Sequence, residues 1–584
     1  MRPALLLAAI ILLGLGGAAR GIEVDTARST DPPIAMPETR FVLSPAPIPL
    51  WIAALSAPET DLRREAAVTI AKAHRLGMPE LQTAIPALVA ALEPADQPPV
   101  VVQAVAQALI ALDARQAAPQ LLALSKAGGT DTAEVIEPAL AAWDYRPARE
   151  VWLRRVSDPR APRGLRLAAI RCLGTVGEPK AAAALEKLAL DPVADPAMRI
   201  EAARAWGRVR TEGLEPVARR LLATDSSPAA VDRLIGIALL GRHDGDESKR
   251  LLEQAALDVQ PAVAGMALER LLELDYRRIL PMTQELLRSS DSKVRRLTVE
   301  ALVRQAETSS VAELGPVLDD PHPEIRGYVR ESLLTMSGDA SLRGPVLKEA
   351  WRALRGDRWR ELEQAVLMLV ALDQKEAVAR FIDLLEFDRA EVHTTAAWGL
   401  RKMAVPETAA PILEKAQRLE ELQRTVGTSA PLGAQFCHLA EALGQLEYAP
   451  ADDLLRKYVP KSSPYPFPAR AAAIWALGRI HANAPPPDLV QSFIERADDN
   501  GIPPESEEVR VAAAIAVGRM KVESAVPVLR RYYLGGPAFG TIDYACGWAL
   551  SQITGEPVPV IEPYVDSRSG WFLEPFDEKN ELRY

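Results

Sequence analysis

The chain repeats one short pattern of apolar and small residues fifteen times, roughly every thirty to forty positions. In each copy an apolar residue precedes an Arg or a substitute, small residues follow, and the copy ends near Ala-Leu-Gly. Clear examples run from Leu165-Arg166 to Gly174 and from Ala469-Arg470 to Gly478. With the Arg counted as position zero, positions −1, +3, +6, +7 and +10 are apolar or small in nearly every copy. These positions share one face of a helix, so each copy predicts an amphipathic helix.

The spacing of the copies predicts the architecture. The zero positions are Arg63, Val102, Glu134, Arg166, Arg199, Arg233, Ala264, Arg295, Arg326, Leu362, His393, Phe436, Arg470, Arg510 and Asp543. From Arg166 to Arg326 successive copies are 33, 34, 31, 31 and 31 residues apart. A repeat of this length is typical of a solenoid, in which each unit buries its apolar face only against its neighbours.

A second signal precedes many copies and predicts another helix. It is a small or apolar residue followed by Pro and a Leu-rich stretch, as in Ile85-Pro86, Ala118-Pro119 and Val526-Pro527. Proline is tolerated in the first turn of a helix, where its missing N–H would have no partner. Asp-Pro turns such as Asp191-Pro192 then separate the helices. Each unit is therefore expected to be a pair of helices, the second of which carries position zero.

These patterns resemble HEAT repeats, in particular the bacterial phycobilisome-lyase-type subset. The resemblance is strongest at Arg166 to Gly177, Ala469 to Ile480 and Glu508 to Met520, and it covers about Pro49 to Gly555. It implies an all-α, right-handed superhelical solenoid of about 14–15 helix pairs, with the second helices on the concave side. It does not imply one function, because HEAT arrays occur in many unrelated roles.

The N-terminus has the layout of a secretory signal. Met1-Arg2-Pro3 gives a positive start, Ala4 to Leu15 is almost wholly apolar, and small residues follow to Ala19. We expect cleavage after residue 19 and export to the periplasm or the extracellular space, with no membrane span afterwards. The alternative is an uncleaved membrane anchor. Residues 20–48 follow as a Pro-rich, flexible leader.

The C-terminal residues 556–584 lie outside the repeat. This tail holds several prolines together with Tyr564, Trp571, Phe572 and Phe576. So many aromatic side chains favour a tail that folds back and caps the last helix pair of the solenoid, residues 49–555. The alternative is a docking tail for a partner.

Charge and cysteine content narrow the classes of function. The net charge of −10 argues against nucleic-acid binding, which needs clustered Lys and Arg. The three cysteines Cys172, Cys437 and Cys546 fall far apart, and the first and last occupy apolar positions of different repeats. We expect buried free thiols, because distant units of a solenoid do not touch.

Position +5 carries the sharpest hint of function. At 100° per residue it lies about 140° round the helix, while the core positions centre near about −75°, so it points away from the core. It is tryptophan in three copies, at Trp398, Trp475 and Trp548, and Tyr544 lies on the same outward side four residues before Trp548.

Position +9 adds a cationic border to these aromatic residues, with Lys402, Arg479 and Arg519. We expect the seven residues to form a surface that binds a protein or peptide partner. The alternative is that neighbouring loops or the aromatic tail cover the indoles within the same chain.

Candidates for chemistry are weak. His243-Asp244-Gly245-Asp246-Glu247 lacks the ligand spacing of a calcium loop, and Cys437-His438 are adjacent helical residues that do not face each other. No catalytic motif, metal site or cofactor is predicted, and the Arg residues at position zero are expected to be structural. The sequence therefore favours an exported, non-enzymatic scaffold. The alternatives are a self-associating envelope protein or, through the resemblance, a lyase-type enzyme, and the oligomeric state stays open.

Overall fold

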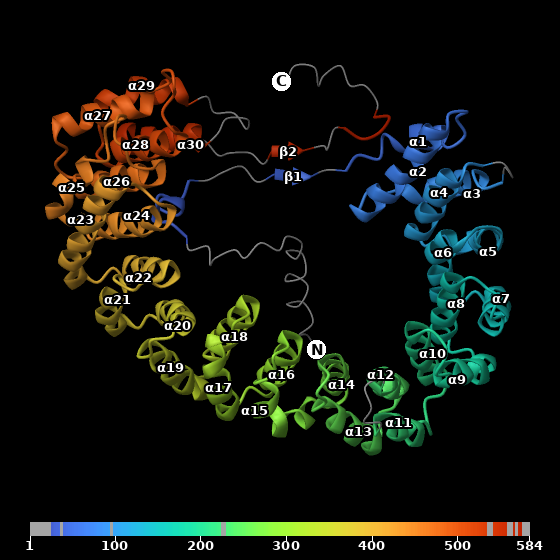
Figure 1. Ribbon diagram of the computed structural model, residues 1–584. Helices are drawn as coiled ribbons and strands as arrows, with labels where there is room; N and C mark the ends of the chain where they lie inside the picture. Colours follow the sequence, from blue (N-terminus) through green and yellow to red (C-terminus); the bar gives the residue numbers. More distant parts are fainter. Residues whose placement is uncertain are drawn as a thin grey trace. The chain divides into compact units, whose positions relative to one another are not determined.

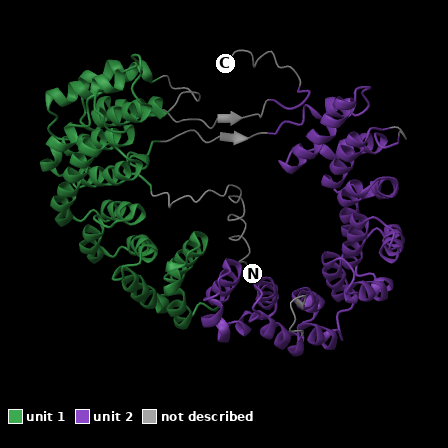
Figure 2. Cartoon of the chain, in the orientation of Figure 1, with its two compact units in different colours: residues 1–38, 305–562 green, residues 39–304, 563–584 purple. Residues whose placement is uncertain are grey.

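A computed structural model describes residues 25–34, 39–41, 43–93, 97–223, 229–533, 541–557, 564–566 and 570–574. The chain forms two compact units, coloured separately in Figure 2. Unit 1 contains residues 1–38 and 305–562, and unit 2 contains residues 39–304 and 563–584. The predicted secretory signal, residues 1–19, lies outside the described residues.

The described residues form thirty α-helices in fifteen consecutive pairs (Figure 1). The first helices of the pairs are α1 (Ile48–Ala54), α3 (Ile85–Ala90), α5 (Ala118–Ala127), α7 (Arg146–Ser157), α9 (Ala182–Leu190), α11 (Glu215–Leu222), α13 (Asp246–Ala256), α15 (Thr283–Leu286), α17 (Thr308–Leu314), α19 (Ala340–Leu354), α21 (Val378–Leu384), α23 (Ala409–Val426), α25 (Asp452–Arg456), α27 (Pro487–Asp498) and α29 (Val526–Tyr532). The second helices are α2 (Thr60–Arg75), α4 (Pro99–Ala111), α6 (Thr130–Ala142), α8 (Arg163–Thr175), α10 (Pro196–Val209), α12 (Ala229–Leu239), α14 (Pro261–Leu274), α16 (Ser292–Gln305), α18 (Pro323–Met336), α20 (Trp359–Ala371), α22 (Ala390–Met403), α24 (Ala430–Gln445), α26 (Phe467–Ile480), α28 (Glu507–Arg519) and α30 (Thr541–Thr554).

Every one of the fifteen zero positions falls on a second helix. This includes Glu134 and Leu362, where the pattern is weakest. Pro lies in the first turn of first helices such as α3, α5, α11 and α29, as the sequence predicts. The all-α solenoid of helix pairs is therefore confirmed.

Where a copy of the repeat ends in glycine within the second helix, as at Gly174 and Gly478, the glycine is a packing residue. A Cβ on Gly478 would lie 2.7 Å from the Cβ of Ala516, and one on Gly174 would lie 2.8 Å from the Cβ of Ala205. In both cases the glycine at position +8 meets the alanine at position +6 of the next second helix. Consecutive second helices approach so closely that a methyl group does not fit between them. This close approach is the reason for the Ala-Leu-Gly segment.

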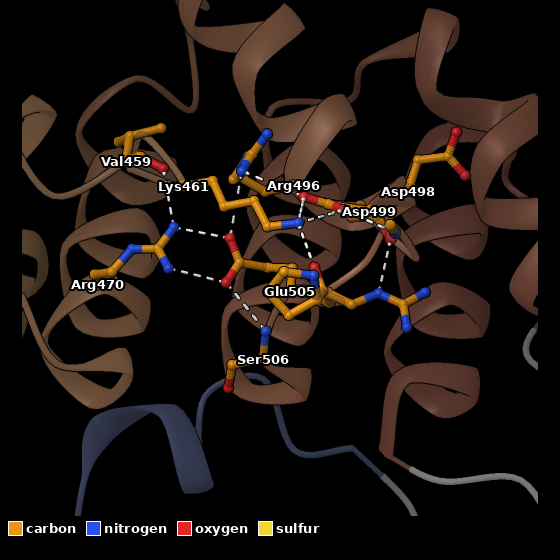
Figure 3. A network of polar contacts seen from close by, with 12 residues as sticks. Val459, Lys461, Arg470, Arg496, Asp498, Asp499, Glu505 and Ser506 are labelled. Carbon is orange, nitrogen blue, oxygen red and sulfur yellow. Dashed lines mark hydrogen bonds and ion pairs between the residues drawn. The ribbon is translucent and has the colours of Figure 1, made fainter. Parts of the chain in front are cut away.

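The arginine at position zero links neighbouring units through polar contacts. The Arg470 guanidinium forms a bidentate pair with Glu505 of the next unit, with Nη1–Oε1 2.9 Å and Nη2–Oε2 2.8 Å (Figure 3). Its Nε donates to the carbonyl of Tyr458 at 3.2 Å. Arg199 likewise donates to Asp232 of the next unit at 2.6 Å. The structural interpretation of these arginines is confirmed where the contacts are described.

Two three-residue strands join the ends of the chain in unit 2. Strand β1 (Thr39–Phe41) pairs in parallel with β2 (Tyr564–Asp566), with Thr39 opposite Tyr564 and Phe41 opposite Asp566. This pairing brings residues 39–41 of the leader beside residues 564–566 of the C-terminal tail. It is an addition to the helical fold that the repeat pattern does not signal.

Residues 570–574 of the C-terminal tail pack on the first helices of the array. Trp51 of α1 donates its Nε1–H to the carbonyl of Phe572, and the rings of Trp51 and Trp571 lie 5.6 Å apart. The Lys72 ammonium of α2 lies 5.6 Å from the Trp571 ring centroid. Residues 570–574 therefore contact α1 and α2, where we expected the last pair. The partner is Trp51, which the repeat pattern treats as an ordinary apolar residue. At the start of the tail, Glu556 forms an ion pair with Arg530 of α29, in the last pair, at 2.7 Å.

The three cysteines are free and buried, as predicted. Burial raises the pKa of Cys437 and of Cys546 to about 12. Such thiols stay protonated at neutral pH and are poor nucleophiles. Within the described part of the chain, none of the helices combines the length and the apolar character that crossing a membrane requires.

Candidate functional site

The +5 positions of five consecutive second helices in unit 1 form a row of side chains. In order from α22 to α30 they are Trp398, Glu441, Trp475, Ile515 and Trp548. These helices pack against one another in sequence, so the row is continuous. We call it the +5 row.

Residues 25–34 of the same chain lie along the +5 row, and we call them the docked segment. Their 3-10 turn, η1 (Ala27–Ser29), lies against α24, where the blue turn meets the orange helices in Figure 1. These residues belong to the leader that the sequence predicts as flexible. Residues 25–34 and the row are all in unit 1.

Asp25 begins the docked segment in a clamp formed by α22. The Trp398 indole donates to its Oδ1 at 2.8 Å, and the Lys402 ammonium donates to its Oδ2 at 2.6 Å. Arg401, almost fully buried, donates to the Asp25 carbonyl and lies 3.3 Å from Oδ1. Trp398 and Lys402 are one helical turn apart, which places both groups on one side of α22. This is the α22 clamp.

Glu441 holds the middle of the docked segment. Its side chain is fully buried and accepts a hydrogen bond from the Ala27 N–H at 2.7 Å and one from Arg28 Nε at 2.9 Å. Its Oε2 also lies 3.5 Å from Arg401 Nε. A buried carboxylate needs such charged and hydrogen-bonding partners. The docked segment therefore supplies two of the hydrogen bonds that satisfy this buried carboxylate.

Asp31 lies in a second clamp, which is formed by α26 and α28. The Trp475 indole donates to the Asp31 carbonyl at 2.7 Å. Arg479 donates to Asp31 Oδ2 at 2.6 Å, and Arg519 donates to Oδ1 at 2.7 Å. Both guanidiniums also lie over the Trp475 ring, 5.5 Å and 5.1 Å from its centroid. This is the α26–α28 clamp.

The positive charges and N–H donors of the two clamps favour the binding of anions. Burial by itself would raise the pKa of Asp25, yet the hydrogen bonds from Lys402 and Trp398 hold it below its ordinary value. Burial lowers the pKa of Arg519, the nearby Arg479 lowers it further, and Asp31 opposes both effects. Two neighbouring guanidiniums that are partly withdrawn from water favour a carboxylate between them.

Five of the seven predicted binding residues contact the docked segment: Trp398, Lys402, Trp475, Arg479 and Arg519. Trp475 is fully buried beneath it. The sequence leaves open whether the indoles meet a partner or this same chain. Both indoles donate hydrogen bonds to the N-terminal segment of the same chain, at Asp25 and Asp31.

Trp548 and Tyr544 do not share these contacts. No hydrogen bond or ion pair joins either residue to the docked segment among residues 25–34 and 541–557. The Trp548 ring lies against α28, because a Cβ on Gly518 would come within 3.1 Å of its Cζ3. Tyr544 is buried. Both side chains pack within the array, although position +5 suggested an open surface for Trp548.

The pattern missed the polar centre of the site. Glu441 shares position +5 with the tryptophans and lies between them, so its register was the available signal. Asp25, Arg28 and Asp31 lie in a stretch without helical period, where nothing local indicates a binding partner. Asp25, Arg28 and Asp31 follow one another at intervals of three residues, and only their contacts with the +5 row show why this spacing matters.

The residues considered as weak catalytic or metal-binding candidates, His243, Cys437 and His438, are held in structural environments. Burial, together with Arg401 and Arg28, lowers the pKa of His438 to about 3, so it stays neutral beside the protonated Cys437 thiol. His243 contacts Glu215 and the carbonyl of Arg210, each at 3.0 Å. Over the residues that the structure describes, no group of three or more His, Cys, Asp or Glu could hold a metal ion.

No protein-family model and no curated protein sequence matches the chain. Among solved structures, a crystal structure of importin beta in an ammonium sulfate condition is similar at 16% identity and a TM-score of 0.47, covering 87% of this chain and 72% of that one. A Kap95p structure with RanGDP is similar at 13% identity and 0.49, covering 88% and 73%. Kap121p bound to Pho4p is similar at 13% and 0.41, covering 87% and 53%. The solenoid of helix pairs in this chain is established by its own helices and the contacts between them.

Proposed function

We propose that this chain is a non-enzymatic helical-repeat scaffold that binds an extended acidic segment of a protein partner on the +5 row. The docked segment occupies the same surface in cis, as a built-in ligand. The observation that carries the proposal is the pair of clamps, each of which combines an indole donor and cations around one aspartate. The second helices would then present the row on the concave side of the solenoid.

Charge supports the acidic character of the partner. The chain as a whole carries a net charge of −10, yet four cations gather at the two clamps. They are Arg401, Lys402, Arg479 and Arg519. Between the clamps lies one buried acid, Glu441, which favours a cation. The preferred ligand is therefore an extended segment with Asp at its start, Arg three residues later and Asp three residues after that.

The test uses the full chain with Asp25→Lys and Asp31→Lys, which we call the released variant. Each new ammonium would face the cations of a clamp, so the cis segment is expected to leave the row. The probe is a fluorescent peptide with the sequence of residues 25–34, followed by fluorescence anisotropy. The wild-type chain should bind little, because its own segment acts at an effective concentration of the order of millimolar. The released variant should bind the peptide.

Two controls make the result specific. Arg519→Ala in the released variant should weaken binding at least about tenfold, since a charge-assisted hydrogen bond contributes about 1.5–3 kcal/mol. A peptide with both aspartates replaced by asparagine should bind weakly. Equal binding of the two peptides, or no binding by the released variant, would contradict the proposal.

Export is proposed from the pattern in residues 1–19, which lie outside the described residues. It would place the partner in the periplasm or outside the cell. Cell fractionation followed by N-terminal sequencing of the mature chain tests this part separately.

A further inference from the structure

A cavity of about 430 Å³ opens beside the docked segment. Its floor is largely apolar, formed by Trp475 of α26 and by Val511, Ala512 and Ile515 of α28. Ile515 is the +5 residue of its helix, so the cavity belongs to the +5 row. Outside the docked segment, its lining comes from α26, α28 and the first residue of α30, so it lies next to the α26–α28 clamp.

The docked segment leaves this cavity largely unfilled. Thr26 and Ser29 line it, and both have small side chains. Ser29 is exposed and bonds its hydroxyl back to the carbonyl of Thr26 at 2.7 Å. In a 3-10 turn, side chains three residues apart lie on the same side. The two small residues therefore face the cavity together without occupying it.

The rim of the cavity is acidic. Glu507 and Glu508 of the first turn of α28 line it, and Glu508 Oε2 lies 3.9 Å from Arg28 Nη1. An additional carboxylate on the ligand would meet these charges at close range. The site therefore accepts carboxylates at its two clamps and disfavours them between the clamps.

We propose that the partner's segment carries a large apolar side chain at the position that Ser29 takes in the docked segment. This inference rests on the proposed function and specifies one side chain of the partner's segment. Such a side chain would bury its own apolar surface and that of Pro468 and Val511, against the already buried Trp475 and Ile515, which the chain's own serine does not do. The partner thereby gains an advantage over the cis segment, and the cis segment remains a weak ligand that can be displaced.

The experiment compares peptides of residues 25–34 on the released variant by fluorescence anisotropy. The Ser29→Phe peptide should bind about tenfold more tightly than the native peptide, which corresponds to about 1.4 kcal/mol. The Thr30→Phe peptide is the matched control, because Thr30 is an exposed neighbour that does not line the cavity. It should bind within about twofold of the native peptide, since burial of apolar area drives the gain.

The outcomes separate the two proposals. If the native peptide binds but Ser29→Phe binds no better than Thr30→Phe, the inference is wrong and the proposed function stands. A gain for a Ser29→Lys peptide without one for Ser29→Phe also overturns it, because the acidic rim would then select the ligand. Val511→Phe in the released variant should fill the cavity from its wall and remove the Ser29→Phe advantage. If the native peptide does not bind, the proposed function itself fails.

Discussion

The indole of Trp475 donates its Nε1–H to the backbone carbonyl of Asp31, 2.7 Å away, across 444 positions of sequence. A contact to a backbone carbonyl recognises the path of the ligand chain as well as its side chains. The carboxylate of Asp31 also accepts hydrogen bonds from Arg479 and Arg519. The site therefore contacts both the side chain and the main chain of Asp31, which is typical of the recognition of a peptide segment.

The first prediction concerns the two indole donors. Trp475→Phe keeps most of the buried ring and removes the hydrogen bond to Asp31. Loss of one such bond is expected to cost about 0.5–1.5 kcal/mol. Hydrogen exchange of residues 25–34, followed by mass spectrometry in the full chain, should become several-fold faster. Trp548→Phe is the control and should leave exchange of this segment unchanged, since Trp548 contacts α28.

The second prediction concerns pH. The pKa of Asp25 is lower in the docked state than in a free chain, where it is about 3.9. A lowered carboxyl pKa stabilises the docked state fully above the free value, and the effect is lost as pH falls through the bound value. Affinity of the released variant for the native peptide should therefore be steady from about pH 5 to 7 and fall below about pH 4.

A peptide with Asp25→Asn tests the assignment of that pH dependence. It should bind more weakly at pH 7 and lose a smaller part of its affinity on acidification. His438 lies nearby, but its pKa of about 3 keeps it neutral from pH 5 to 7. A steep change of affinity near pH 6 would contradict the assignment.

The third prediction concerns the buried pair Arg470–Glu505. Both side chains are almost fully buried, with 2% and 1% of their surface exposed. Arg470→Ala removes the bidentate partner of the buried Glu505 and leaves it only the longer pair with Arg496 at 3.4 Å, so the loss is expected at the lower end of the range for a broken buried pair, about 3 kcal/mol of stability. Denaturant unfolding measures the loss. Arg424→Ala removes an exposed pair with Glu421 and should leave the stability nearly unchanged.

The fourth prediction concerns the repeat glycine. Gly478→Ala would place a methyl group 2.7 Å from the Cβ of Ala516 and should destabilise the protein by about 1–3 kcal/mol through overpacking. Gly327→Ala is the matched control, because a Cβ there meets nothing within 4 Å. It should stabilise the chain by up to about 1 kcal/mol, the helix propensity of alanine over glycine. Equal effects in thermal unfolding would refute the packing role of Gly478.

The sequence alone determined the helix pairs, because each pair depends on local periodicity and on contacts with the next unit. Fifteen zero positions fall on fifteen second helices, and the buried thiols follow from the same register. It also indicated Trp398, Trp475 and their cations, because a polar or aromatic residue outside the apolar face stands out against a repeat.

Only the tertiary structure decided what covers those residues. Asp25 and Asp31 meet their clamps across hundreds of positions, and Trp571 of the tail meets Trp51 at the other end of the array. A segment without periodic structure carries no local signal of where it docks, since its conformation is set by the surface that holds it. That surface exists only once five second helices have stacked and placed their +5 side chains in one row.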